Sequence, residues 1–166
     1  MANPFRRFLP RRNHPKGVSI FFARDQSCVL VAALHLNGQG IYVEQAEPRR
    51  LEGPPEPEAL GRAFRQAFDA FFERDQDLSR RRVADWPALR ASGLRSKAAF
   101  DKRFLPVGVF AVNEANLIVE ASARYPVSPG VPEDAGFQIT VAFNPLLDEA
   151  EIGDRLIRLA QLAGLG

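Results

Sequence analysis

The sequence of 166 residues contains few of the side chains that build catalytic and metal-binding sites. It has one cysteine, Cys28, and two histidines, His14 and His35. A single cysteine excludes an intramolecular disulfide, which fits a reducing compartment, and so few Cys and His residues exclude a Cys/His zinc site. Cys28 and His35 lie seven residues apart on one expected strand, roughly 23 Å, too far to act as a pair. We expect Cys28 to be a structural thiol and His35 to be partly exposed near a strand end.

Long apolar runs and the common catalytic motifs are missing too. No window of 18 apolar residues occurs, so no membrane-spanning helix is expected, and the basic N-terminus is not followed by the apolar run of a signal peptide. Neither GxGxxG, GxxxxGK[ST] nor G-x-S-x-G is present. Many carboxylates fall in expected first helical turns, where the helix dipole accounts for them. The sequence therefore predicts no enzymatic activity, no catalytic residue, no metal and no cofactor.

Charge is unevenly distributed behind a net charge of +2. Residues 1–17 carry +5, residues 18–78 carry −4, residues 79–103 carry +6 and residues 104–166 carry −5. Such segregation bears on partners and solubility more than on fold. We expect a flexible basic arm over 1–17 and a single globular domain over 18–166, in which the basic connector 79–103 joins two acidic halves.

The first half predicts three strands and a helix. Segments 18–23, 28–36 and 40–46 are rich in Val, Ile and Phe and are separated by hairpin signals. After a proline-rich loop, residues 58–74 carry apolar side chains spaced by three and four, which predicts an amphipathic helix. The apolar stripe consists of Leu60, Ala63, Phe64, Ala67, Phe68, Phe71 and Phe72.

The second half repeats this order. Segments 105–112, 116–123 and 137–143 predict strands, and residues 149–163 predict a second amphipathic helix. The predicted fold class is α/β (α+β): one domain with an internal duplication of a β-β-β-α unit, in which two long helices pack on a mainly antiparallel sheet. A hydrophobic-Gly pair opens each helix, Leu60-Gly61 and Ile152-Gly153, which suggests close approach of helix to sheet.

The basic connector permits two interpretations. Its exposed cations could contact phosphates, and the alternative function is therefore a small nucleic-acid-binding protein that uses the 79–103 strip. Phe100 and Phe104, however, are spaced four apart like inward anchors of a short helix, which makes the connector a structural cap with Lys97 and Lys102 solvated. A third possibility is an enzyme whose site follows none of these motifs. A pocket with perturbed ionisable groups would indicate it.

The order of several short motifs points to a family. Ser96-Lys97-x-x-Phe100-x-Lys102 precedes the second predicted hairpin, and hydrophobic-Gly pairs open both helices. Together they resemble the immunity proteins of bacterial contact-dependent growth inhibition systems, in the family with two βα halves. The resemblance covers roughly residues 18–164. The sequence departs from the family in the loop YPVSPGVPEDAGF, which lacks a Trp-x-Gly, and in helix openings that keep only the hydrophobic-Gly pair.

The resemblance implies a cytoplasmic, non-enzymatic protein. It would bind and neutralise the C-terminal toxin domain, often a nuclease, of a cognate surface-delivered effector, with nucleic acid and membrane not expected as partners. A nuclease carries a basic cleft, so acidic loops are the expected docking surface. We expect the toxin to contact Glu114, Glu133 and Asp134, with Tyr125 and Phe137 as aromatic anchors.

Overall fold

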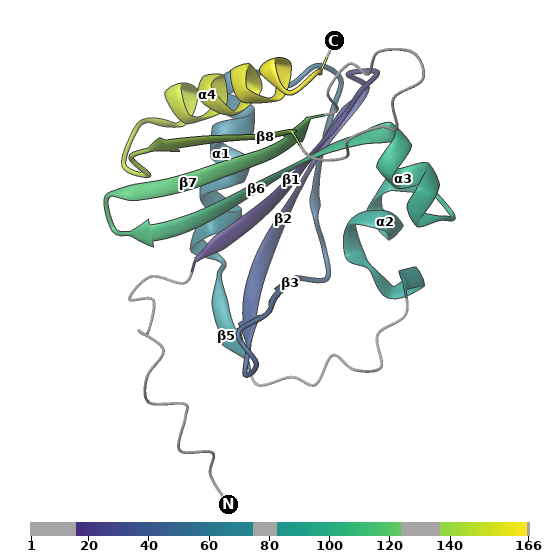
Figure 1. Cartoon of the computed structure of the whole chain (residues 1–166), viewed down its shortest axis with the longest axis horizontal. Helices are drawn as coiled ribbons and strands as arrows, with labels where there is room; N and C mark the ends of the chain where they lie inside the picture. Colours follow the sequence, from purple (N-terminus) through teal and green to yellow (C-terminus); the bar gives the residue numbers. More distant parts are fainter. Residues whose placement is uncertain (1–15, 75–82, 124–136, 166) are drawn as a thin grey trace, which may run out of the picture.

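The protein is a single α+β domain built on an eight-stranded, mainly antiparallel sheet packed against helices (Figure 1). The computed structural model describes residues 16–74, 83–123 and 137–165. The main path of the sheet runs β3-β2-β1-β6-β7-β8, and β4 and β5 both pair with β2. The strands are β1 (Gly17–Ala23), β2 (Cys28–Asn37), β3 (Tyr42–Glu44), β4 (Arg49–Glu52), β5 (Phe72–Arg74), β6 (Phe104–Asn113), β7 (Asn116–Ala123) and β8 (Phe137–Phe143). The helices are α1 (Pro57–Asp69), the 3₁₀ turn η2 (Val83–Asp85), α2 (Pro87–Ser92), α3 (Lys97–Arg103) and α4 (Glu149–Leu162).

The two halves of the chain meet at the antiparallel pair β1–β6 in the middle of the sheet. Its register runs from Gly17 opposite Phe110 to Ala23 opposite Phe104. Side chains alternate between the two faces of a strand, so Val18, Ile20 and Phe22 enter the main core, while Phe21 points to the opposite face. Every other strand pair is also antiparallel except β2–β5.

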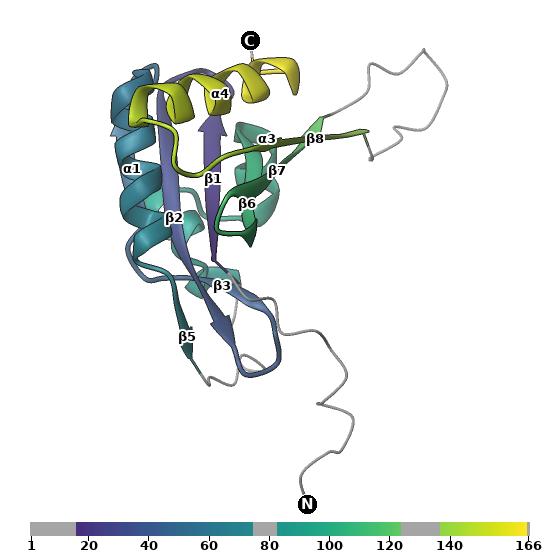
Figure 2. The same ribbon diagram turned by 90° about the vertical axis from the view of Figure 1, so that its left-hand side faces the viewer.

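Helices α1 and α4 cover one face of the sheet (Figure 2). Their apolar stripes supply Leu60, Phe64, Ile152 and Leu156, all fully buried. The predicted helix 149–163 agrees with the observed one to within a residue, and Asp148 caps it by accepting a hydrogen bond from the N–H of Glu151 at 2.7 Å. The main core thus lies between these two helices and all the central strands.

The two helical glycines mark a helix–helix crossing, which corrects the expected helix–sheet approach. A Cβ on Gly61 would overlap the carbonyl of Glu149 and lie 2.8 Å from its Cα. A Cβ on Gly153 would overlap the carbonyl of Pro57 and lie 2.9 Å from its Cα. Each glycine therefore faces the residue four positions before the other glycine, and the contact is reciprocal. Only glycine lets the two backbones approach this closely.

The basic connector folds into α2 and α3, which cover part of the opposite face of the sheet (Figure 1). Their side chains form a second, smaller core with Phe21 and Leu30 of the sheet. Phe100 lies 5.1 Å from Phe21, 4.5 Å from Trp86 and 4.6 Å from Phe104, measured between ring centroids. The inward orientation predicted for Phe100 and Phe104 is confirmed, since they are 2% and 1% exposed.

The first half departs from its predicted pattern around the end of α1. The helix was expected to continue to residue 74 but ends at Asp69, and Phe72 begins strand β5, parallel to β2. The side chain of Gln45 donates to the carbonyls of Leu34 and Ala70 at 3.0 and 2.8 Å, which ties the chain after the helix to the sheet. The bond to Ala70 satisfies a carbonyl that would have accepted a helical hydrogen bond in a longer α1.

Two further corrections follow from pairing with β2. The proline-rich loop contains strand β4, which pairs with the first part of β2. His35, expected to be partly exposed, is 3% exposed. It is covered because the ring of Phe72 stacks on its imidazole at 5.2 Å, with the two planes 5° apart.

An internal duplication is not shown by this architecture. The order of the sheet, with β1 and β6 adjacent and the later strands of each half outward, suits two related units. The first half nevertheless contains β4 and β5, which have no counterpart among the described residues of the second half.

A candidate partner-binding face

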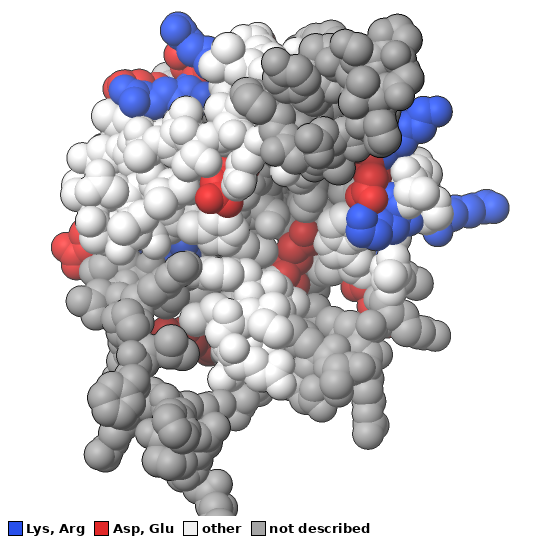
Figure 3. Space-filling view, in the orientation of Figure 1, with Lys and Arg blue, Asp and Glu red and all other residues white. Residues whose placement is uncertain are grey.

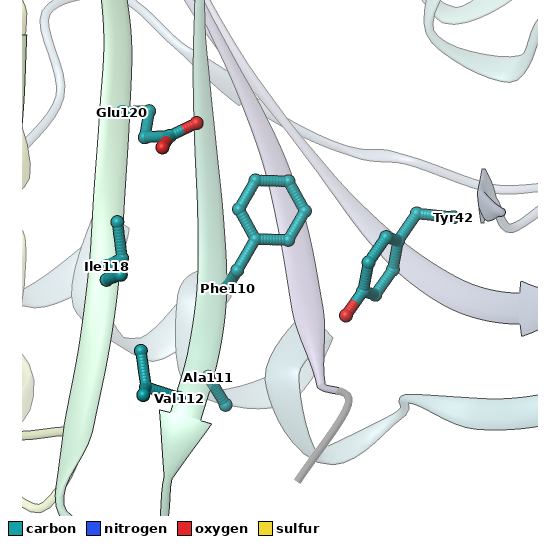
Figure 4. A pocket seen from close by; sticks show the side chains of 6 residues that line it. All are labelled: Tyr42, Phe110, Ala111, Val112, Ile118 and Glu120. Atoms are coloured by element: carbon teal, nitrogen blue, oxygen red, sulfur yellow. The ribbon is translucent and has the colours of Figure 1, made fainter. Parts of the chain in front are cut away.

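Helices α2 and α3 cover only one end of the second face of the sheet. Farther along the same face, side chains of β3, β6 and β7 surround a hollow of about 430 Å³ (Figure 4). We refer to its lining as the open sheet face, which consists of Tyr42, Phe110, Val112, Ile118 and Glu120; Ala111 also borders the hollow. A hollow of this size, lined mainly by apolar side chains with a few polar groups, is typical of a binding site.

Two aromatic rings form the wall of the hollow beside β1. The ring centroids of Tyr42 and Phe110 are 5.1 Å apart. Both rings lie against glycine: a Cβ on Gly17 would be 3.2 Å from Tyr42 and 3.3 Å from Phe110, and one on Gly108 would be 2.9 Å from Phe110. Because these two strand positions have no side chain, the rings can lie close to the backbone, which holds the wall in place.

Two polar groups face the hollow. Glu120 is half-buried, and within residues 16–74, 83–123 and 137–165 no cation forms an ion pair with its carboxylate. The Tyr42 hydroxyl oxygen is buried and has no hydrogen-bond partner in the same ranges. A carboxylate set in an apolar surface attracts a cation because local water screens it less than on an open surface. The hollow therefore suits a group that joins apolar surface to positive charge.

The surface around the hollow carries little charge. Figure 3 shows the described surface over β6 to β8 as mostly uncharged, with Lys and Arg gathered over α4 and near α3 at its borders. Val112, which lines the hollow, is 50% exposed, and so is Ile41, which precedes Tyr42 in the sequence. Neighbouring exposed apolar side chains of this kind commonly mark an interaction site.

Of the residues predicted to contact a toxin, Glu114 and Phe137 belong to the described part of the chain. Glu114 lies exposed in the turn between β6 and β7, which the side chain of Asn113 closes by accepting from the N–H of Ala115 at 2.9 Å. Phe137 begins β8, opposite Ala123 at the other end of β7. Tyr125, Glu133 and Asp134 lie outside the described residues. Seven steps along β7, about 23 Å, separate its two ends, so among the described residues Phe137 does not lie beside Glu114.

The motif residues of the connector have structural environments. Ser96 caps α3 by accepting from the N–H of Ala99 at 3.2 Å, and Phe100 anchors the helix in the second core. Lys97 forms an ion pair with Asp101, and Arg103 forms one with Asp25 at 3.6 Å. Part of the positive charge expected to serve nucleic acid is thus offset by neighbouring carboxylates.

Glu44, a half-buried carboxylate whose pKa is clearly raised, serves the fold. Glu44 accepts hydrogen bonds from the N–H of Ala88, at 3.0 Å, and from the indole of Trp86. Burial raises its pKa above the ordinary value of 4.5, and the two hydrogen bonds oppose that rise. Glu44 joins β3 to the start of α2 and does not line the hollow, so it does not point to an enzyme site there.

Metal-binding clusters and membrane-spanning helices are both absent from the described residues. Within these residues, no group of three or more His, Cys, Asp and Glu side chains is placed to hold a metal ion. No helix in the described part of the chain combines the length and apolarity needed to cross a bilayer.

Sequence reasoning did not identify the open sheet face, although one signal was available. A strand with one solvated face alternates apolar and polar residues, whereas β6 reads FLPVGVFAVN and is apolar on both faces. One end of its second face packs under α3 through Phe104. The other end of this face of β6 carries Phe110 and Val112, which line the hollow.

Comparison with known proteins identifies the fold. No family model matches the chain, and no curated protein matches it. A protein of unknown function, NMB0488 from Neisseria meningitidis, superposes with a TM-score of 0.64 at 17% identity over 91% of this chain and 98% of its own. A chain of the CdiA-CT/CdiI toxin and immunity complex from Yersinia pseudotuberculosis superposes with a TM-score of 0.59 at 12% identity over 89% of this chain and 96% of its own. At these identities the likeness establishes a shared fold, and the chain is similar along nearly its whole length to a component of a toxin and immunity complex.

Proposed function

We propose that this protein is an immunity protein that binds and neutralises the toxin domain of a contact-dependent growth inhibition effector. One observation carries the proposal: the fold matches a chain of the CdiA-CT/CdiI complex over 96% of that chain. The match also agrees with the order of the short motifs in the sequence.

The surface of the protein supports a binding role. The open sheet face offers an apolar hollow with one carboxylate and one hydroxyl. Complementary charge between acidic loops of this protein and a basic nuclease would speed association and select the partner. We propose that Glu114, Glu133 and Asp134 supply this charge, with Tyr125 and Phe137 as anchors. Toxin blockade would then take place in the cytoplasm and require no catalysis.

The test uses the C-terminal domain of the large secreted protein that we expect to be encoded immediately upstream of this chain. The two purified proteins should form a stable complex, and the chain should abolish the toxicity of that domain in cells that express both. If the two proteins do not bind at micromolar concentrations and the chain gives no protection, the immunity role is wrong.

The acidic contact set is tested separately. A Glu114→Ala/Glu133→Ala/Asp134→Ala variant should fold normally and associate with the toxin domain more slowly and with less dependence on salt. The matched control, Glu47→Ala/Glu56→Ala/Glu73→Ala, removes the same charge from exposed positions elsewhere and should associate like the unaltered protein. Equal behaviour of the two variants would remove these loops as the docking surface without affecting the immunity role.

A further inference from the structure

The described chain begins at the border of the open sheet face. The carbonyl of Lys16 accepts a hydrogen bond from the N–H of Ala111 at 2.8 Å, and Gly17 pairs with Phe110 across the β1–β6 ladder. Ala111 and Phe110 both line the hollow. Residues 1–15 are therefore attached at the wall of the hollow, whatever position they take beyond it.

The whole hollow lies within reach of this segment. Glu120 pairs with Gly108, which is four residues from Val112 along β6, so the hollow extends about 13 Å along the strands. Phe8 is eight residues from Lys16 and can reach roughly 26 Å from it. A short tether of this kind holds the segment at an effective concentration of about a millimolar near the face.

The chemistry of the segment complements that of the face. Residues 1–15, MANPFRRFLPRRNHP, contain four arginines, no acidic residue, two phenylalanines and one leucine. The face contains an aromatic wall, exposed Val112, half-buried Ile118, and a carboxylate with no cation paired to it among the described residues. Phe5 or Phe8 can pack against the apolar surface while a neighbouring arginine pairs with Glu120.

Three prolines suit the segment to an extended course. Pro4, Pro10 and Pro15 restrict the backbone, and each disfavours a helical conformation in the residue before it. A chain that is already extended loses less conformational entropy when it settles into a groove.

We propose that residues 1–15 dock reversibly onto the open sheet face of their own chain. Arginine and phenylalanine side chains of the segment occupy the hollow beside Glu120, Phe110 and Tyr42. The face is therefore occupied in the free protein for part of the time, and any partner that uses it must displace the segment. This intramolecular contact does not depend on whether the protein binds a toxin.

Disulfide trapping in the full chain tests the proposal. The native Cys28 is 1% exposed, so two introduced thiols can be followed without interference. One variant is Leu9→Cys/Val112→Cys, which keeps both phenylalanines and all four arginines of the segment. The matched control is Leu9→Cys/Ala70→Cys. Ala70 is exposed and follows Asp69, whose carboxylate lies 3.8 Å from the Lys16 ammonium on the α1 side of the sheet.

In oxidised glutathione, the Val112 pair should close at least about fivefold faster than the Ala70 pair, because disulfide formation needs Cα atoms within about 7 Å of each other. The rate should be independent of protein concentration, since the contact lies within one chain. Adding Glu120→Gln should slow closure by about two- to threefold, the size of an exposed ion pair, whereas Glu73→Gln should leave it unchanged.

Equal closure rates for the two pairs would overturn the proposal. Cross-linked dimers whose yield rises with protein concentration would also overturn it, and would assign the face to a second copy of the chain. A measurement without cysteines provides a second check: amide hydrogen exchange at Phe110 and Val112 should be faster in a Phe5→Ser/Phe8→Ser variant than in the unaltered chain. Unchanged exchange would count against docking.

Discussion

At the scale of single residues, glycine determines how the two main helices meet. Gly61 and Gly153 lie where a Cβ would overlap the backbone of the opposite helix. Glycine in the interior of an exposed helix is destabilising by about 1 kcal/mol relative to alanine, so Gly→Ala would ordinarily stabilise α1. At this crossing the close contact reverses that expectation.

We expect Gly61→Ala to lower the free energy of unfolding by about 1–3 kcal/mol, the range for overpacked cores. Gly153→Ala should behave in the same way. The double variant should lose less free energy of unfolding than the two single variants together, because helices already pushed apart by one alanine leave room for the second. Urea denaturation measures both effects. Gln161→Ala, at an exposed position in α4, serves as a control that should change stability little. A stabilised Gly61→Ala protein would show that the helices do not cross at these glycines.

Glu44 gives the fold a pH dependence with a definite sign. Its pKa in the folded protein is raised above the ordinary value of 4.5, chiefly by burial. The protonated form is therefore favoured by folding, and this contribution is fully present below pH 4.5 and is lost as pH rises through the folded pKa. Glu44→Gln keeps an oxygen that can accept from Ala88 and Trp86 but removes the buried charge.

We therefore expect Glu44→Gln to be at least as stable as the unaltered protein at pH 7. Its stability should also fall less than that of the unaltered protein as the pH rises above 4.5. Thermal melts at a series of pH values measure the difference. Glu73→Gln, an exposed change on β5, is the matched control. Clear destabilisation of Glu44→Gln at pH 7 would mean that the ionised carboxylate stabilises the start of α2.

At the scale of secondary-structure elements, the end of α1 separates two phenylalanines that the sequence placed on one stripe. Phe64 is fully buried between α1 and the sheet, whereas Phe72 belongs to β5 and is 42% exposed. Phe64→Ala should lower the free energy of unfolding by about 3–5 kcal/mol. Phe72→Ala should lose much less, because its main contact is the stacked ring of His35. Similar losses in denaturant melts would show that the helical stripe continues past Asp69.

The cap formed by α2 and α3 is expected to depend on one ring. Phe100→Ala removes the side chain that joins Phe21, Trp86 and Phe104, and should cost about 3–5 kcal/mol. The chain has one tryptophan, so its fluorescence reports on this cap, and the emission should shift to the red. Lys102→Ala, exposed on the same helix, should change neither property. An unshifted emission would mean that the cap packs without Phe100.

At the scale of the whole molecule, the folded domain includes Lys16 and Gly17, two residues before its expected start at residue 18. Lys16 and Gly17 were assigned to the flexible arm, but Lys16 bonds to Ala111 and Gly17 starts β1. Removing residues 1–15 should change the free energy of unfolding by about 1 kcal/mol or less, as expected for a weak, reversible contact. Removing residues 1–17 should lower it further, because the start of the central strand is lost. Calorimetry of the two truncated proteins distinguishes these outcomes, and equal melting temperatures would contradict the new boundary.

The sequence by itself determined most of the strands, the second long helix and the inward side chains of the connector. Hairpin signals and apolar periodicity depend on neighbouring residues, so β1 to β3, β6 to β8, the helix over 149–163 and the anchors Phe100 and Phe104 follow from local pattern. The order of the motifs also suggested the fold that the comparisons identify.

Only the tertiary structure decided what covers each inward face. The matching glycines suggested a close approach at Gly61 but not that the neighbour is α4. The apolar sequence of β6 does not show where the cap formed by α2 and α3 ends. The strand pairing of β4 and β5, the burial of His35 and the hollow beside Glu120 all arise from contacts between residues distant in the sequence. Such contacts are fixed by the packing of the whole chain, because no local pattern specifies which two surfaces will meet.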